Sequence, residues 1–97
     1  MKKSYAKEKD NIIEIIDEKQ FQIIQNKGAG YILITDIATG NKIHLPFCTC
    51  VTSKNFFEKV IINKCENGQY YWLSHYNLGK VPFKIVPCSV CRPYKKM

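Results

Sequence analysis

The chain has 97 residues, 45% of them hydrophobic, and carries 15 Lys and Arg against 8 Asp and Glu, a formal net charge of +7. A chain of this length forms one domain, here 1–97, and buries only about two-thirds of its unfolded surface, so its core is thin. No apolar run approaches the ~18 residues that a membrane span needs, which argues against a membrane protein. The positive charge favours polyanionic partners, above all nucleic acid.

Cysteine usage indicates metal binding rather than disulfide bonding. The five cysteines are an odd number, so a disulfide framework would leave one thiol over. No charged-then-apolar leader precedes them, so nothing marks the chain for secretion. We therefore expect a cytoplasmic protein whose reduced cysteines serve as metal ligands.

The N-terminal half is expected to form strands. Residues 1–10 are too charged to pack and predict a flexible basic arm, whereas the isoleucines of 12–16 fit either a strand or a short helix. The segment 21–25 favours a strand because β-branched and aromatic residues dominate it. The surest strand is 31–36, which continues through a Gly/Asn turn into 42–44 and so predicts a hairpin.

The C-terminal half is expected to contain the main helix and a further strand. Asn55 followed by Glu58 is typical of a capping box, which predicts a helix from Asn55 to about Lys64. Its buried stripe is predicted to be Phe57, Val60 and Ile61. After the Asn67-Gly68 turn, the densely aromatic segment 69–73 predicts another strand.

Two short clusters of soft ligands lie some forty residues apart. His44 and Cys48 form a His-x3-Cys pair, and Cys88 and Cys91 form a Cys-x2-Cys pair between prolines. Three thiolates and an imidazole are a donor set typical of a tetrahedral structural zinc, which would tie the two segments together. Cys50 could replace Cys48, but alternation along an extended chain lets only one of them reach the ion.

The same residues resemble a known family. The order G-x-x-x-H-x3-C starting at Gly40, a Phe-containing helix, an aromatic strand and the closing P-C-x2-C-x-P ending at Pro93 is similar to the small zinc-binding domain of the Ada type, in its His-containing form. The resemblance covers 40–93, the expected zinc-binding region. It implies association with DNA. In Ada itself a cysteine at the first ligand position accepts a methyl group, whereas His44 stands here, so alkyl transfer is not expected.

Aromatic and basic residues near the second cluster predict a nucleic-acid surface. A guanidinium next to the knuckle can hold a phosphate with two hydrogen bonds, and aromatic rings can stack on bases. The candidate residues are Arg92, Lys84, Lys80, Trp72 and Tyr70. The alternative for the aromatic residues is that all of them are buried to enlarge a small core.

We expect no enzymatic activity, because four protein ligands leave no open position on the metal and no acid follows a recognised catalytic spacing. The expected molecule is an α+β domain with a small antiparallel sheet of about four strands, one main helix and a structural zinc knuckle. Its expected function is zinc-stabilised binding of nucleic acid, DNA before RNA, as an adaptor or regulator. The alternative is a protein-interaction module, such as a phage or toxin-antitoxin component, that docks through the aromatic strand or forms a homodimer.

Overall fold

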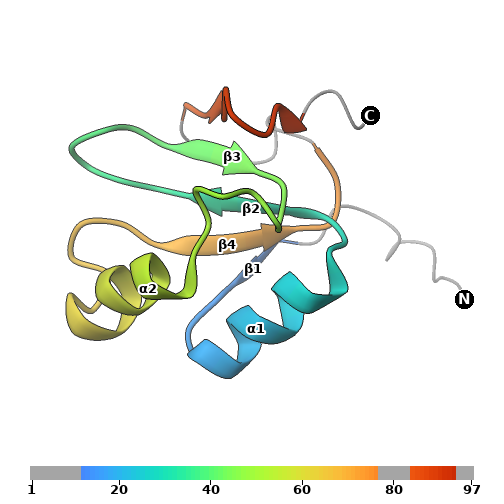
Figure 1. Ribbon diagram of the computed structural model, residues 1–97. Helices are drawn as coiled ribbons and strands as arrows, with labels where there is room; N and C mark the ends of the chain where they lie inside the picture. The colour runs from blue at the N-terminus through green and yellow to red at the C-terminus, as the bar shows by residue number, and fades with distance from the viewer. Residues whose placement is uncertain (1–11, 77–83, 94–97) are drawn as a thin grey trace, which may run out of the picture.

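The computed structural model describes residues 12–76 and 84–93, and within them the protein is an α+β domain built on a five-stranded sheet (Figure 1). The strand order is β1-β4-β2-β3-β5, with antiparallel pairing except between β3 and β5, which run parallel. The strands are β1 (Ile12–Glu14), β2 (Tyr31–Ile34), β3 (Lys42–His44), β4 (Tyr70–Leu73) and β5 (Val86–Pro87). The expected α+β class is confirmed, with a fifth strand and a parallel pair added.

The hairpin of β2 and β3 was predicted correctly, and the side chains of Asp36 and Asn41 hold its turn: Asn41 Oδ1 accepts the N–H of Asp36 at 3.2 Å. Asp36 Oδ1 accepts hydrogen bonds from the backbone N–H groups of Ala38 and Thr39, at 2.9 and 3.0 Å. Gly40 then takes a left-handed conformation with φ of 93°. Such a conformation costs a residue with a Cβ free energy, which glycine avoids. The turn therefore sends β3 back along β2 and delivers His44 to the end of the strand.

The strand expected at 21–25 is wrong, because these residues belong to helix α1 (Glu18–Lys27). Asp17 caps the helix by accepting the N–H of Gln20 at 2.7 Å, and the Gln20 side chain accepts the N–H of Ile16 in return. Gly28, with φ of 68°, ends it. Both bonds cap the start of the helix, although Gln20 bonds the residue before the N-cap rather than the N-cap itself, and they outweigh the strand preference of the β-branched residues inside.

The main helix begins earlier than expected and buries a different face. Its N-cap is Thr52, whose Oγ1 accepts the N–H of Asn55 at 3.1 Å, so α2 (Ser53–Phe56) starts before the predicted capping box and continues as the π-helix η2 (Phe57–Ile62). The predicted stripe is wrong at two of its three positions. Val60 is buried, but Phe57 and Ile61 are 38% and 36% exposed, and Phe56 takes the core position.

The helices cover one face of the sheet (Figure 1). On that face the rings of Phe21 and Phe56 stack at 4.7 Å, and Tyr70 meets both rings edge-on. Cys48 and Cys88 belong to this same buried cluster. The opposite face has a smaller cluster, Leu33, Ile43 and Leu73. No helix in the described part of the chain has both the length and the apolar character to cross a membrane.

A candidate metal centre

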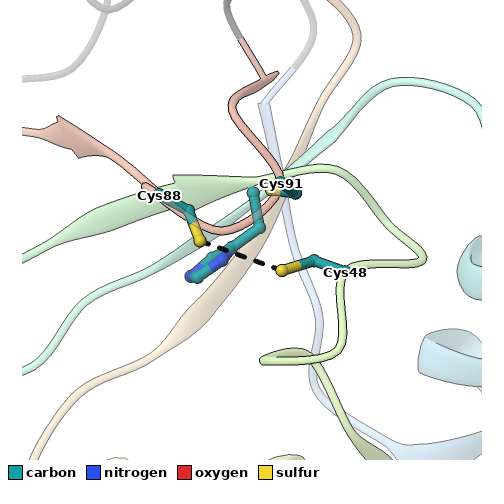
Figure 2. Close-up of side chains that lie close together, drawn as sticks. Cys48, Cys88 and Cys91 are labelled. Carbon is teal, nitrogen blue, oxygen red and sulfur yellow. Dashed lines mark hydrogen bonds between the residues drawn. The ribbon is translucent and has the colours of Figure 1, made fainter.

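The two ligand pairs meet at the edge of the larger core. The ligand atoms of His44, Cys48, Cys88 and Cys91 all lie within 4.8 Å of one another, so the group could hold a metal ion. Figure 2 shows Cys48 and Cys88 pointing toward each other, with their Sγ atoms 3.8 Å apart. A tetrahedron with Zn–S bonds of about 2.3 Å has S–S edges of about 3.8 Å. This pair already has that spacing, and an ion would draw the other ligands inward.

Strand pairing explains how distant segments converge. β3 and β5 run parallel with Ile43 opposite Pro87, and the N–H of Cys88 donates to the carbonyl of Ile43 at 2.9 Å. His44 and Cys88 are the next residues along these two strands, so the register sets them side by side. The parallel pair therefore fixes one ligand of each cluster on a rigid element, which favours a defined coordination geometry.

Backbone N–H groups point at each of the three sulfur atoms. Cys48 Sγ accepts from the N–H of Cys50 at 3.4 Å, and Cys88 Sγ accepts from the N–H of Val90 at 3.3 Å. Both bonds span two residues, so the two segments repeat the same local turn. Cys91 Sγ accepts from the N–H of Leu45 at 3.2 Å. Such donors stabilise thiolates and orient metal ligands.

The buried Nδ1 atom of His44 is the strongest indication that this group of residues could bind a metal ion. His44 is 5% exposed, and its Nδ1 is buried with no hydrogen-bond partner among the described residues. An unsatisfied buried polar atom costs roughly 1–3 kcal/mol, so native proteins seldom leave one. Burial, followed by the nearby positive charge of Lys42, lowers the pKa of His44 to about 4. The ring is therefore neutral near pH 7, the form that binds metals.

Burial makes two of the three thiols in this group harder to ionise. Burial raises the pKa of Cys48 to about 11 and also raises the pKa of Cys91. At Cys88 burial acts in the same direction, but the N–H groups of Cys91 and Val90 outweigh it and lower the pKa. Two of the three thiols, those of Cys48 and Cys91, therefore need a nearby positive charge to ionise near pH 7, and a divalent metal would supply that charge.

The remaining cysteines and the second histidine lie outside this group. Cys50 is exposed, Cys65 is half-buried, and neither belongs to the set of close ligand atoms. His75 is exposed, and its Nδ1 lies 3.0 Å from the hydroxyl of Ser74. The geometry thus brings together the same four residues that the spacing predicted, with Cys48 rather than Cys50.

The predicted nucleic-acid residues that the structure describes differ in their exposure. Arg92, which follows the last ligand, and Lys84 are both exposed. Trp72 is half-buried, and its Nε1 donates to the carbonyl of Ala29 at 2.8 Å. Its strand, β4, lies two positions from β3 in the sheet. Tyr70 is 2% exposed, so its ring is a core element and the expected base stacking on it is wrong. Lys80 lies outside the described residues.

Two apolar residues at the knuckles were missed by the sequence prediction. Phe47 is 60% exposed directly before Cys48, and Val90 is 62% exposed between Cys88 and Cys91. Arg92 follows with φ of 48°. Each of the two segments that carry the Cys and His pairs therefore exposes an apolar side chain, and the C-terminal one also exposes a cation. In the sequence, Phe47 and Val90 each directly precede a cysteine of the group, and this apolar residue next to a candidate ligand is the pattern that could have identified them.

No protein-family model, curated protein or solved structure matches the chain.

Proposed function

We propose that this protein is a zinc-stabilised nucleic-acid-binding domain, with His44, Cys48, Cys88 and Cys91 as the zinc ligands. The observation that carries the metal is the convergence of the four ligand atoms around an unpartnered buried nitrogen, His44 Nδ1. Three sulfurs and one imidazole suit zinc better than magnesium or calcium, which prefer oxygen ligands. Four protein ligands complete a tetrahedron, so the role assigned to the ion is structural and no catalytic role is proposed.

The knuckle tips, defined as Phe47, Val90 and Arg92, support the choice of partner. Single strands are bound by cationic grooves with rings on which bases stack, and the exposed ring of Phe47 and the exposed guanidinium of Arg92 supply one group of each kind. The net charge of +7 adds long-range attraction to phosphates. Single-stranded DNA is therefore the partner we favour, as the Ada-type resemblance also suggests DNA.

A direct test is the binding of zinc-loaded protein to a fluorescent single-stranded DNA at 50 and 200 mM salt. Counterion release predicts an affinity that falls steeply between the two concentrations. Binding that is unchanged over this range would contradict the proposal.

The second candidate is a protein-interaction module, and one observation favours it. β1 is an edge strand, and Ile12 and Ile13 on it are 40% and 44% exposed. An open edge can accept a strand from another protein. The aromatic strand β4, which we expected to be the docking edge, lies between β1 and β2 and is not an edge. Recovery of a partner in a pull-down despite nuclease treatment would favour this candidate.

A further inference from the structure

A cleft of about 410 Å³ adjoins the metal centre. One wall comes from the β2–β3 turn and β3, and the other from α2 and η2, which Figure 1 places at the same end of the sheet. His44 and Cys50 both border it. The cleft therefore shares His44 with the metal group, and a molecule bound there would lie against the metal ligand.

The helical wall presents polar side chains along one face. Asn55, Glu58 and Asn63 border the cleft and are exposed. They are spaced three and five residues apart, and the π-helical hydrogen bond from the N–H of Asn63 to the carbonyl of Glu58, at 2.9 Å, accommodates the second interval. π-helical turns occur frequently at functional sites. Within 12–76 and 84–93, no hydrogen bond of the structure uses the Glu58 carboxylate or the Asn63 carboxamide, so both can bind a ligand.

Asp36 and Lys59, which also line the cleft, form an ion pair with each other. Lys59 Nζ bonds Asp36 Oδ2 at 2.7 Å and the carbonyl of Thr35 at 2.8 Å. This leaves Glu58 as the acidic acceptor and Lys42 as the basic group at the cleft. Such a balance does not favour a strong anion. It favours a neutral ligand that offers hydrogen-bond donors to a carboxylate and both donors and acceptors to carboxamides.

His44 adds a donor once the metal is bound. With Nδ1 on the ion, the ring proton resides on Nε2, and a ligand histidine almost always donates that proton to an oxygen. No hydrogen bond to a protein acceptor satisfies this group in the described part of the chain. Because His44 borders the cleft, water or a bound ligand there can supply the acceptor.

We infer that the cleft binds one unstacked nucleobase with an exocyclic amino group, such as cytosine or adenine, from a single strand held by the knuckle tips; this inference rests on the proposed function. Glu58 accepts from the amino group, as acidic side chains do from cytosine. Asn63 bonds the neighbouring edge of the base. Lys42 contacts the adjoining phosphate.

The test compares four single-stranded 12-mers, dC12, dA12, dT12 and an abasic strand of equal charge, on zinc-loaded protein at 50 mM salt. dC12 and dA12 are expected to bind about tenfold more tightly than dT12, and the abasic strand, which has no base to stack on Phe47, is expected to bind more weakly than dT12. Glu58→Leu, which removes the carboxylate and leaves no hydrogen-bond acceptor, abolishes that preference. Glu66→Leu makes the same change at an exposed residue that does not line the cleft, and it keeps the preference.

The outcomes separate the two proposals. Equal affinity for dC12, dA12 and dT12, or an effect of Glu58→Leu on the preference that matches Glu66→Leu, overturns the base site and leaves the nucleic-acid function standing. Absence of binding to every strand overturns the proposed function and the base site together. Loss of the preference in Glu58→Leu alone supports the inference.

Discussion

Cys48 Sγ and Cys88 Sγ lie 3.8 Å apart although forty residues separate them. The contact depends on two local features, the turn that follows β3 and the parallel pairing of β3 with β5. Neither segment could order three sulfurs by itself. The loop closure has an entropic cost that an ion bound to both ends can offset.

The ligand assignment predicts different outcomes for neighbouring thiols. Cys48→Ser should lose cobalt binding at the site, seen as loss of the intense thiolate-to-cobalt absorption, because a buried ligand is removed. Cys50→Ser should keep it, since Cys50 is exposed and outside the group. If Cys50→Ser loses the absorption instead, the assignment of Cys48 is wrong.

Arg92→Ala should weaken binding to single-stranded DNA and lower the salt dependence by about one phosphate contact. Lys84→Ala should act in the same direction if the strand continues toward β5. Lys19→Ala is the matched control, because it removes one exposed positive charge from α1. Equal losses for Arg92→Ala and Lys19→Ala would mean that only net charge matters.

Phe47→Ala should reduce affinity by about fivefold or more, because stacking of one base on an aromatic ring contributes roughly 1–3 kcal/mol. Phe47 is 60% exposed, so its removal should change the thermal unfolding temperature little. Titration of the wild-type and Phe47→Ala proteins with the same DNA, together with their melting curves, separates an effect on binding from an effect on folding. Unchanged affinity in a folded Phe47→Ala protein would remove the knuckle tips from the interface.

The Asp36–Lys59 ion pair predicts a specific pH dependence. The hydrogen bond from Lys59, and then that from the Thr39 N–H, lowers the pKa of Asp36 from 3.8 to about 2. Because the folded-state pKa is depressed, the carboxylate stabilises the fold above about pH 4, and that contribution disappears as pH falls toward 2.

The measurement is the difference in unfolding free energy between the wild-type chain and Asp36→Asn. At pH 7 the difference should be about 1–2 kcal/mol, from a partly exposed charged hydrogen bond and the turn that Asp36 holds. Lys59→Met should raise the pKa of Asp36 in an NMR titration. A pKa that does not respond to Lys59→Met contradicts the pairing.

Much of the fold follows from local sequence signals. The hairpin was predictable because a Gly/Asn turn separates two β-branched runs. The convergence of His44, Cys48, Cys88 and Cys91 was predictable because Cys and His recur there at a spacing typical of zinc ligands. Helix α1 was missed although Asp17 and Gln20 have capping-box spacing, since the isoleucines of the segment favour a strand. Local propensity and capping conflict there, and packing of Phe21 on Phe56 resolves the conflict.

The site was harder to predict beyond its ligands. Phe47 is exposed because of the conformation of the turn before Cys48, and the spacing of residues in the sequence does not predict that conformation. The burial of Tyr70 and the partial burial of Trp72 depend on the flanking strands and helices. The cleft beside His44 combines residues from the hairpin, the helices and β4. Such long-range juxtapositions have no signal in a single sequence.

The central claim is that one zinc ion joins the hairpin to the C-terminal segment. The most direct measurement is the elemental analysis of untagged wild-type and Cys88→Ser protein, with melting curves before and after chelation. The account predicts about one zinc per wild-type chain, none in Cys88→Ser, and a large fall in melting temperature on chelation. Wild-type protein that holds no stoichiometric metal, or that melts unchanged after chelation, would contradict it.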